Sequence, residues 1–426
     1  MRASFVAGLA SLAIVSQAAM LRIPIESIDV PSVIQASRQN GLDIDSDNQL
    51  NFGAYLPRRD NNPQPACASP RTTRPVGLPT KIQYSAWIEG KIHLGTPPQE
   101  FTAKISTIGP YSYVLSKACY VWGCIGRVKY NATASSTYKE NGTYFDLDGP
   151  VNGRISNDVL RIGYREASGG DDSNVLVIPD QDFGEATFDG SCWLPILPCG
   201  GFLGLGFSSD NEDEAAVTGV PPVLNWARQQ KSRGDAAVVG MYISPDMMRL
   251  GQVTFGGLDR AHYIGELHWN ALAKRGAWSA HLNRIVTRTR TGGVERSVPM
   301  ADTPTLFSTT TNLLASLSPE QAKAVNEELL GGTEMDDPQS RGYYVLPCSS
   351  LDTLPSISFV IGSEYYTFKA SEYVRIYDSK GVKTCGSLIN GSEEEQHLGL
   401  AFLRKYYVGV DIGQNRIGLA LAKMVV

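Results

Sequence analysis

Hydrophobic and polar positions alternate in many short runs from about residue 82 to the end of the chain. The runs are rich in β-branched and aromatic residues, and Gly, Pro, Asn or Asp bounds them. This pattern predicts strands at 84–95, 101–106, 111–116, 159–163, 174–179, 237–244, 251–257, 356–362, 365–370 and 406–412. Helical periodicity occurs in two segments, 221–230 and 318–330. Many strands with few helices predict an all-β protein of packed sheets or barrels.

The N-terminal part of the chain has a different composition. An apolar run follows Arg2 and ends in small residues around Ser16 and Ala18, which predicts a secretory signal peptide over 1–18. Residues 19–80 are polar and Pro-rich and contain the pair Arg58-Arg59, as in a pro-segment with a processing site or in a linker. No later apolar run is long enough to span a membrane. We therefore expect a secreted, extracellular protein.

The charge of the chain narrows the range of partners. It has 43 acidic and 38 basic residues and a net charge of −5, and no basic stretch stands out. This argues against a nucleic-acid partner. We expect a monomer that binds no membrane. The five His residues lack metal-ligand spacing and no phosphate-binding or dinucleotide-binding motif occurs, so no metal or cofactor is expected.

Seven cysteines and three sequons agree with secretion. Pairing of near neighbours in chain order is the simplest arrangement, although spacing does not determine connectivity. It would join Cys119 to Cys124, Cys192 to Cys199 and Cys348 to Cys385, and leave Cys67 over. The predicted glycosylation sites are Asn131, Asn141 and Asn390.

The chain also repeats one arrangement at long range. The segment "KISTIGP" is followed by "GGFLGLGF", and "PMADTPT" is followed by "QHLGLAFL". Ser106 precedes Gly204 by 98 residues, and Asp302 precedes Gly399 by 97. The matched spacing predicts a duplicated lobe.

Several motifs between about residues 81 and 423 resemble the pepsin-like aspartic proteases of the secreted, fungal type. They are "LGTPPQEF" at 94–101, "SSTY" at 135–138, "GQVTFGGLDRAHYIGELHW" at 251–269 and "LGLAFLRKYYVGVDIGQNRIGLA" at 398–420. The resemblance implies two β-barrel-like lobes, 81–258 and 259–426, with a substrate cleft between them. It also implies the disulfides Cys119–Cys124 and Cys348–Cys385.

The chemistry of that family needs two aspartates sharing a proton, one from an Asp-Thr-Gly triplet in each lobe. The resemblance places Ser106 where the first aspartate belongs; Thr107 keeps the Thr and Ile108 replaces the Gly. In the second lobe it points to Asp302, Thr303 and Pro304. We expect Thr107 and Thr303 to lock the two loops together, so that the scaffold is kept while the catalytic pair is broken.

Three functions are compatible with this pattern. The first is a homologue that has lost endopeptidase activity and binds a protein or peptide in its cleft. The second is a weakly active aspartic endopeptidase that takes its missing acid from the flap hairpin, either Asp146 or Asp148. The resemblance places Asp146 near the position of the family's flap Tyr, and a register shift would place Tyr144 there instead. The third is an enzyme acting on a small molecule with Asp302 as general acid or base. If Asp302 takes part in no chemistry, it is a structural residue.

Overall fold

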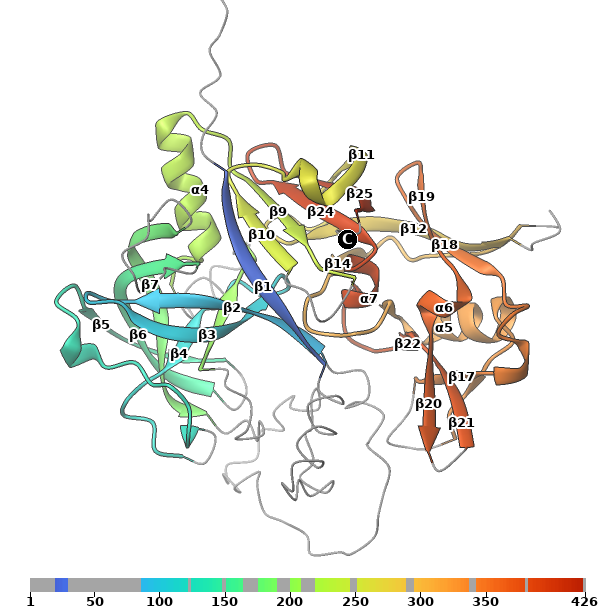
Figure 1. The fold of residues 1–426 in the computed structure, drawn as a ribbon, viewed down its shortest axis with the longest axis horizontal. Coiled ribbons are helices and arrows are strands. Elements are labelled where there is room, and N and C mark those ends of the chain that lie inside the picture. The colour runs from blue at the N-terminus through green and yellow to red at the C-terminus, as the bar shows by residue number, and fades with distance from the viewer. Residues whose placement is uncertain are drawn as a thin grey trace, which may run out of the picture.

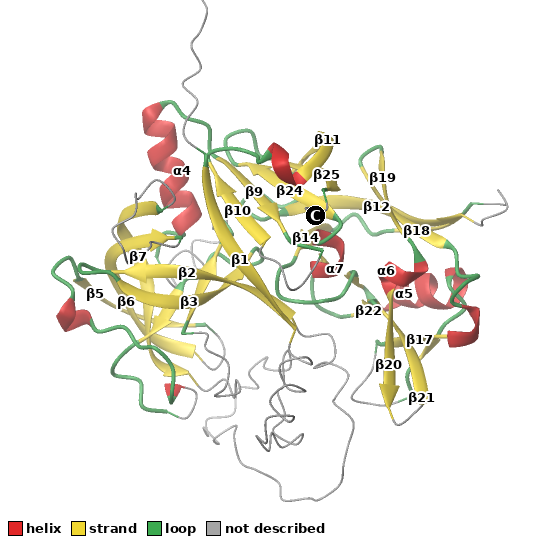
Figure 2. Cartoon of the chain, viewed as in Figure 1, coloured by secondary structure: helices red, strands yellow, loops and turns green. Residues whose placement is uncertain are grey.

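The chain forms two lobes that flank a central sheet (Figure 1). The structure is a computed structural model that describes residues 20–29, 86–121, 124–147, 151–163, 175–189, 200–207, 219–245, 251–288, 295–336, 342–379 and 382–423. Strands dominate both lobes and helices are short and few (Figure 2). The predicted all-β, bilobal fold is confirmed. None of the helices in these ranges is both long and apolar enough to cross a membrane.

The N-terminal lobe is a closed barrel. Its strands pair in the order β2-β3-β8-β4-β7-β6, and β6 pairs back onto β2. Because the sheet closes on itself, β2 and β6 pair with each other instead of leaving two free edges. The strands are β2 (Ala86–Leu94), β3 (Gln99–Ser106), β4 (Tyr113–Leu115), β5 (Lys139–Asp146), β6 (Val151–Ile162), β7 (Leu176–Asp189) and β8 (Gly201–Gly204). β5 extends the barrel as a hairpin with β6, and the 3-10 turn η2 (Ala132–Ala134) lies before it.

The predicted helix at 221–230 is confirmed as α4 (Pro222–Arg233). Proline at its first turn fits a position where the backbone N–H has no helical partner, and Gly234 ends it in the left-handed conformation. The helix buries Val223, Trp226 and Ala227 in the hydrophobic core.

The central sheet takes strands from both halves of the chain, in the order β11-β25-β24-β9-β10-β1. Its members are β1 (Leu21–Asp29), β9 (Val238–Tyr242), β10 (Gly251–Phe255), β11 (Tyr263–Ala271), β24 (Tyr406–Asp411) and β25 (Arg416–Ala422). β9 pairs with β24, so the middle of the sequence and its C-terminal end meet here. The predicted lobe boundary at 258/259 falls between β10 and the turn η4 (Arg260–His262).

The C-terminal lobe contains two further sheets. One has the order β19-β18-β12-β14-β23-β15-β22 and the other β16-β17-β21-β20, with β13 paired to β12. The strands are β12 (Ser279–Arg288), β13 (Arg296–Pro299), β14 (Pro304–Phe307), β15 (Ala315–Leu317), β16 (Thr333–Glu334), β17 (Tyr344–Leu346), β18 (Ser356–Ile361), β19 (Glu364–Phe368), β20 (Val374–Ser379), β21 (Val382–Ser387), β22 (Ile389–Gly391) and β23 (Gln396–Leu398). The helical segments are α5 (Pro319–Lys323), the π-helical turn η5 (Ala324–Leu329), η7 (Cys348–Ser350), α6 (Ala370–Tyr373) and α7 (Leu400–Leu403).

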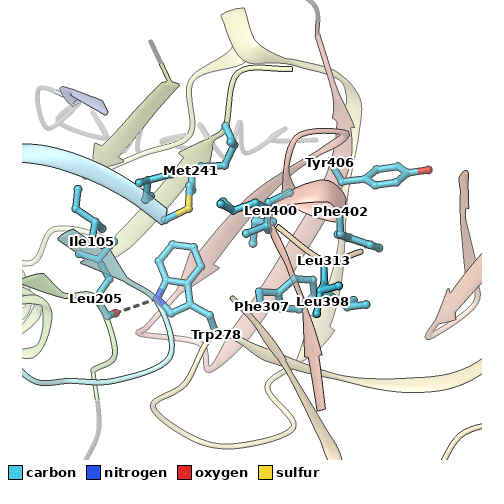
Figure 3. Close-up of a cluster of buried hydrophobic side chains, with 14 of the residues drawn as sticks. Ile105, Leu205, Met241, Trp278, Phe307, Leu313, Leu398, Leu400, Phe402 and Tyr406 are labelled. Atoms are coloured by element: carbon cyan, nitrogen blue, oxygen red, sulfur yellow. Dashed lines mark hydrogen bonds between the residues drawn. The ribbon is translucent and has the colours of Figure 1, made fainter. Parts of the chain in front are cut away.

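The hydrophobic core runs without a break from one lobe into the other. At the junction Trp278 is 1% exposed and donates its indole N–H to the carbonyl oxygen of Leu205, 2.9 Å away (Figure 3). Ile105 and Leu205 of the N-terminal lobe lie beside it, and Phe307 and Leu398 follow on the other side. The two lobes are therefore packed against each other as parts of one core.

Strand β1 lies inside the segment 19–80, which the sequence predicts to be a pro-segment or linker. Leu21, Ile23 and Ile25 are buried, and the strand pairs with β10 and β2. This strand was missed, although the alternation of Leu21, Ile23 and Ile25 with Arg22 and Pro24 was a strand signal. The predicted signal peptide and the pair Arg58-Arg59 lie outside the described residues, so removal of the segment stays a prediction.

An ion pair ties β1 to the rest of the sheet. Arg22 Nε donates to Asp259 Oδ2 at 2.7 Å, and Gln252 donates to the same oxygen at 2.9 Å. Burial alone would raise the pKa of the Asp259 carboxyl, but the hydrogen bonds from Arg22, Gln252 and the N–H of Ala261 lower that pKa to about 2. Because the folded-state pKa lies below the unfolded value of about 3.9, the pair stabilises the fold above pH 4. That contribution is lost as the pH falls towards 2.

We predict that Arg22→Gln lowers the free energy of unfolding by about 1–3 kcal/mol at pH 6, since a charged hydrogen bond is removed. The difference from the wild-type chain should shrink as the pH falls from about 4 to about 2. Urea unfolding at pH 6, 4 and 2 measures this. Arg154→Gln is the matched control, because the pair Arg154–Glu140 is largely exposed and should contribute little. A constant difference at every pH would contradict the assignment.

Candidate active site

The two lobes repeat one arrangement of strands. In the N-terminal lobe β3 runs parallel to β8, and Ser106 stands opposite Gly204. In the C-terminal lobe β14 runs parallel to β23, and the N–H of Ser308, directly after β14, donates to the carbonyl oxygen of Leu398. β4 runs parallel to β7 and antiparallel to β8. In the same way, β15 runs parallel to β22 and antiparallel to β23. The predicted duplication is present: β3 ends at Ser106, and Ser308 directly follows the end of β14.

Glycines are required where each unit is crossed by another stretch of backbone. A Cβ atom at Gly204 would lie 2.5 Å from the carbonyl oxygen of Tyr111, and one at Gly399 would lie 2.3 Å from that of Leu313. Any side chain would push these loops apart. The two glycines of the sequence repeat therefore mark close backbone approaches.

Two threonines lock the units together across the lobe interface. Thr107 Oγ1 donates to the carbonyl oxygen of Phe307 at 2.5 Å, and Thr309 Oγ1 donates to that of Ile105 at 2.8 Å. The N–H of Thr107 donates back to Thr309 Oγ1 at 3.2 Å. Both threonines are buried. We call these three bonds the threonine lock; it makes Thr107 and Thr309 equivalent, and with them the preceding residues Ser106 and Ser308.

The two serines have matching surroundings. Ser106 is 2% exposed and Ser308 is fully buried. The N–H of Ile108 donates to Ser106 Oγ at 3.3 Å, and the N–H of Thr310 donates to Ser308 Oγ at 3.2 Å. Ser308 Oγ also lies 3.0 Å from Thr310 Oγ1. In the described residues neither hydroxyl is hydrogen-bonded to a carboxylate or a histidine, so no base is in place to remove a proton from it.

The prediction that Asp302 and Thr303 form the second member of the pair is wrong. Asp302 lies in the turn before β14, its side chain is 97% exposed, and its neighbour is His281 Nδ1 at 3.1 Å. Thr303 is exposed, and Pro304 begins the strand rather than replacing a loop glycine. The strand runs a further four residues before it reaches the lobe interface, and this places Ser308 there instead.

A signal for the correct pair was present in the sequence. "ISTIG" and "FSTTT" both place an apolar residue before Ser-Thr, and each ends a predicted or buried strand. The Asp-Thr pair at 302–303 matches the family triplet by residue type, and this match favoured Asp302. Only the threonine lock shows which stretch meets the first lobe.

A cleft of about 1070 Å³ opens beside Ser308. Trp87, Lys104 and Ile108 of the N-terminal lobe line it, so it lies between the lobes. The remaining lining comes from the C-terminal lobe, chiefly α5, β22 and the segment 392–395 before β23. An interlobe cleft next to Ser308 is thus present, as the resemblance implied, although Ser106 is not part of its lining.

The predicted flap is the hairpin of β5 and β6. Tyr144 and Asp146 are both exposed on the same side of it, while Phe145 between them is buried. Burial chiefly, and Asp146 in addition, raise the pKa of Tyr144. None of the described hairpin residues lines the cleft beside Ser308, and Asp148 lies outside the described residues.

The disulfides Cys119–Cys124 and Cys348–Cys385 are confirmed. Disulfides form and persist in oxidising compartments, which fits a secreted or vacuolar protein. Cys67, Cys192 and Cys199 lie outside the described residues.

The three sequon asparagines differ in accessibility. Asn141 is exposed and Asn131 is half-buried, and each accepts a hydrogen bond from the threonine of its own sequon. Asn390 is 6% exposed and lines the cleft, so the folded chain offers little room for a glycan there. Glycosylation at Asn131 and Asn141 stays a prediction.

The paired β units, their threonine lock and the interlobe cleft define a two-lobed protein of the pepsin-like aspartic protease class. The family model for eukaryotic aspartyl proteases matches residues 88–422. Renin of Canis lupus familiaris is 28% identical over 92% of this chain and 91% of its own length. Cathepsin D of Mus musculus is 28% identical over 83% and 85%, and vacuolar protease A of Aspergillus fumigatus is 30% identical over 78% of each chain.

The chain belongs to the eukaryotic aspartyl protease family. Its relatives include mammalian and fungal proteins, so the fungal type stays a prediction.

We predict that Thr309→Val lowers the free energy of unfolding by about 2–4 kcal/mol, because it leaves the carbonyl of Ile105 and the N–H of Thr107 buried without their partner. Thr303→Val is the matched control at an exposed position and should change stability by less than about 0.5 kcal/mol. Chemical denaturation of both variants measures the difference. A larger loss of stability in Thr303→Val than in Thr309→Val would contradict the threonine lock and favour Thr303 as the residue that contacts the first lobe.

Proposed function

We propose that this chain is a family member without aspartic endopeptidase activity that binds a protein or peptide in its interlobe cleft. Ser106 and Ser308 stand, on this proposal, at the two positions from which the family's aspartates act. The observation that carries it is the threonine lock, since it makes these two serines the equivalent residues of the two lobes.

The proposal follows from the chemistry of the paired aspartates. One ionised carboxylate takes a proton from the attacking water, and its protonated neighbour polarises the scissile carbonyl. A serine hydroxyl carries no negative charge at the pH of this reaction and accepts a proton poorly. With serine in both places the site has neither the base nor the acid.

The retained scaffold supports a binding role. The lock, the continuous core and the cleft beside Ser308 are all present. A preformed cleft of this volume binds a ligand without first paying the entropy of assembling a site. The signal-like N-terminus and the two disulfides support secretion of the protein.

The two alternative readings lack a supporting observation. A weak endopeptidase would need an acid at the serines, and Asp146 of the flap hairpin does not line the cleft. An enzyme using Asp302 would need that carboxyl in a cleft, and it is 97% exposed.

We predict that the purified protein does not digest a denatured protein substrate between pH 3 and 6, and that Asp302→Ala leaves this background unchanged. Ser106→Asp alone should also remain at background. The combination of Ser106→Asp, Ile108→Gly, Ser308→Asp and Thr310→Gly should raise the rate at least about 100-fold, because it restores both carboxylates and their loops. Release of acid-soluble peptides measures the rate.

Folding of each variant is checked by its thermal midpoint and circular dichroism. Digestion by the wild-type chain that disappears in a variant with Ser106→Ala and Ser308→Ala would overturn the proposal. If Ser106→Asp alone digests the substrate and adding Asp302→Ala abolishes this activity, Asp302 is the catalytic partner of position 106 after all.

A further inference from the structure

Ser316 carries a hydroxyl that no other group of the described structure uses. The residue belongs to β15, is only 7% exposed and lines the interlobe cleft. Its Oγ makes no hydrogen bond within the part of the chain that the structure describes, and it is not sealed from solvent. Such a hydroxyl bonds to water, which a ligand group that reproduces the bond can displace. The hydroxyl is therefore open to a molecule that enters the cleft.

His397 stands directly opposite Ser316 on the neighbouring strand β23. Side chains directly opposite each other in an antiparallel pair share one face of the sheet, with Cβ atoms roughly 4.5–5.5 Å apart. The imidazole also lines the cleft. Neither of its ring nitrogens is hydrogen-bonded to another described residue, and neither is sealed from solvent. Two unused polar side chains thus lie next to each other on the wall of the cleft.

The imidazole of His397 is uncharged at neutral pH. Burial chiefly lowers its pKa, and Glu395 only partly opposes this shift. The strands on either side of β23 place Leu306 and Ser316 opposite it, and neither is charged. The other charged residues of the lining are Lys104, Glu320, Lys323, Glu334, Glu393 and Glu394. A neutral imidazole has one donor and one acceptor nitrogen, so the pair offers both kinds of hydrogen bond without a charge.

We propose that Ser316 and His397 form a subsite for a neutral carboxamide, the side chain of an asparagine or glutamine in a bound peptide. The amide N–H donates to the unprotonated nitrogen of His397, and the amide oxygen accepts from the hydroxyl of Ser316. This rests on the proposed binding function and names the chemistry of its ligand.

The carboxamide fits this pair better than its isosteres do. It carries a donor and an acceptor on one carbon atom, so it reaches two neighbouring partners at once. A carboxylate has no donor for the imidazole nitrogen, and the glutamates in the same lining repel it. An apolar side chain displaces the water from both residues and leaves them without partners.

Binding of matched fluorescent peptides to the full chain at pH 7 tests this. The peptides are short Ala/Gly sequences with one variable central residue, and anisotropy gives each Kd. One set has asparagine, aspartate or leucine at the centre, and the other has glutamine, glutamate or methionine. Each set thus compares an amide, a carboxylate and an apolar group of similar size. We expect the amide to bind about tenfold more tightly than the other two in at least one set, since only the amide makes both hydrogen bonds.

Variants locate the interaction. Ser316→Ala and His397→Phe should each reduce the advantage of the amide about fivefold and leave the apolar peptide unchanged, because each removes one of the two bonds. The double variant should lose about tenfold, less than the product of the single losses, since both bonds hold one group. Ser363→Ala and His268→Phe are the matched controls, because both residues are exposed and lie outside the cleft lining. Thermal midpoints confirm that each variant is folded.

The outcomes separate the two proposals. Equal binding of amide, carboxylate and apolar peptides in both sets, or no binding by any of them, overturns the carboxamide subsite and leaves the proposed binding function standing. Equal losses in the cleft variants and their matched controls also overturn the subsite. Cleavage of the peptides by the wild-type chain at acid pH contradicts the proposed loss of activity, whatever their order of affinity.

Discussion

The threonine lock is the interaction on which the architecture of the site depends. Thr107 and Thr309 each reach across the interface to the carbonyl before the other lobe's serine. These groups are buried, so neither water nor another side chain takes over if a partner is lost. The lock thereby holds two loops from distant parts of the chain in one mutual position. None of its three bonds involves the side chain of the residue before either threonine.

This separation of scaffold and chemistry explains how the fold persists while the proposed loss of catalysis occurs. Two carboxylates held next to each other repel and must share a proton, which is a cost that the fold of an active enzyme sustains. Serines at both positions remove that cost and bond to the nearby N–H groups of Ile108 and Thr310. The two serine positions then carry no charge.

The central sheet carries the other structural constraint, because it joins the lobes through strands from three regions of the chain. β1 fills the place between β10 and β2, and its apolar side chains are part of the shared core. The ion pair between Arg22 and Asp259 adds a side-chain contact between this strand and the turn after β10.

Local periodicity in the sequence predicted the class of fold and the two helical segments. The resemblance of its motifs to a known family predicted two of the disulfides and pointed to the first serine. It did not reveal β1, whose short alternation is embedded in a polar segment, or the partner of Ser106. Residue type favoured Asp302, but the length of β14 and its pairing with β23 carry the chain past that aspartate to Ser308. Which residues meet across an interface is decided by strand register and by hydrogen bonds between residues some 200 positions apart. The likeness of "ISTIG" to "FSTTT" does not show which stretches meet, so the tertiary structure was needed to identify the pair of serines and the cleft beside Ser308.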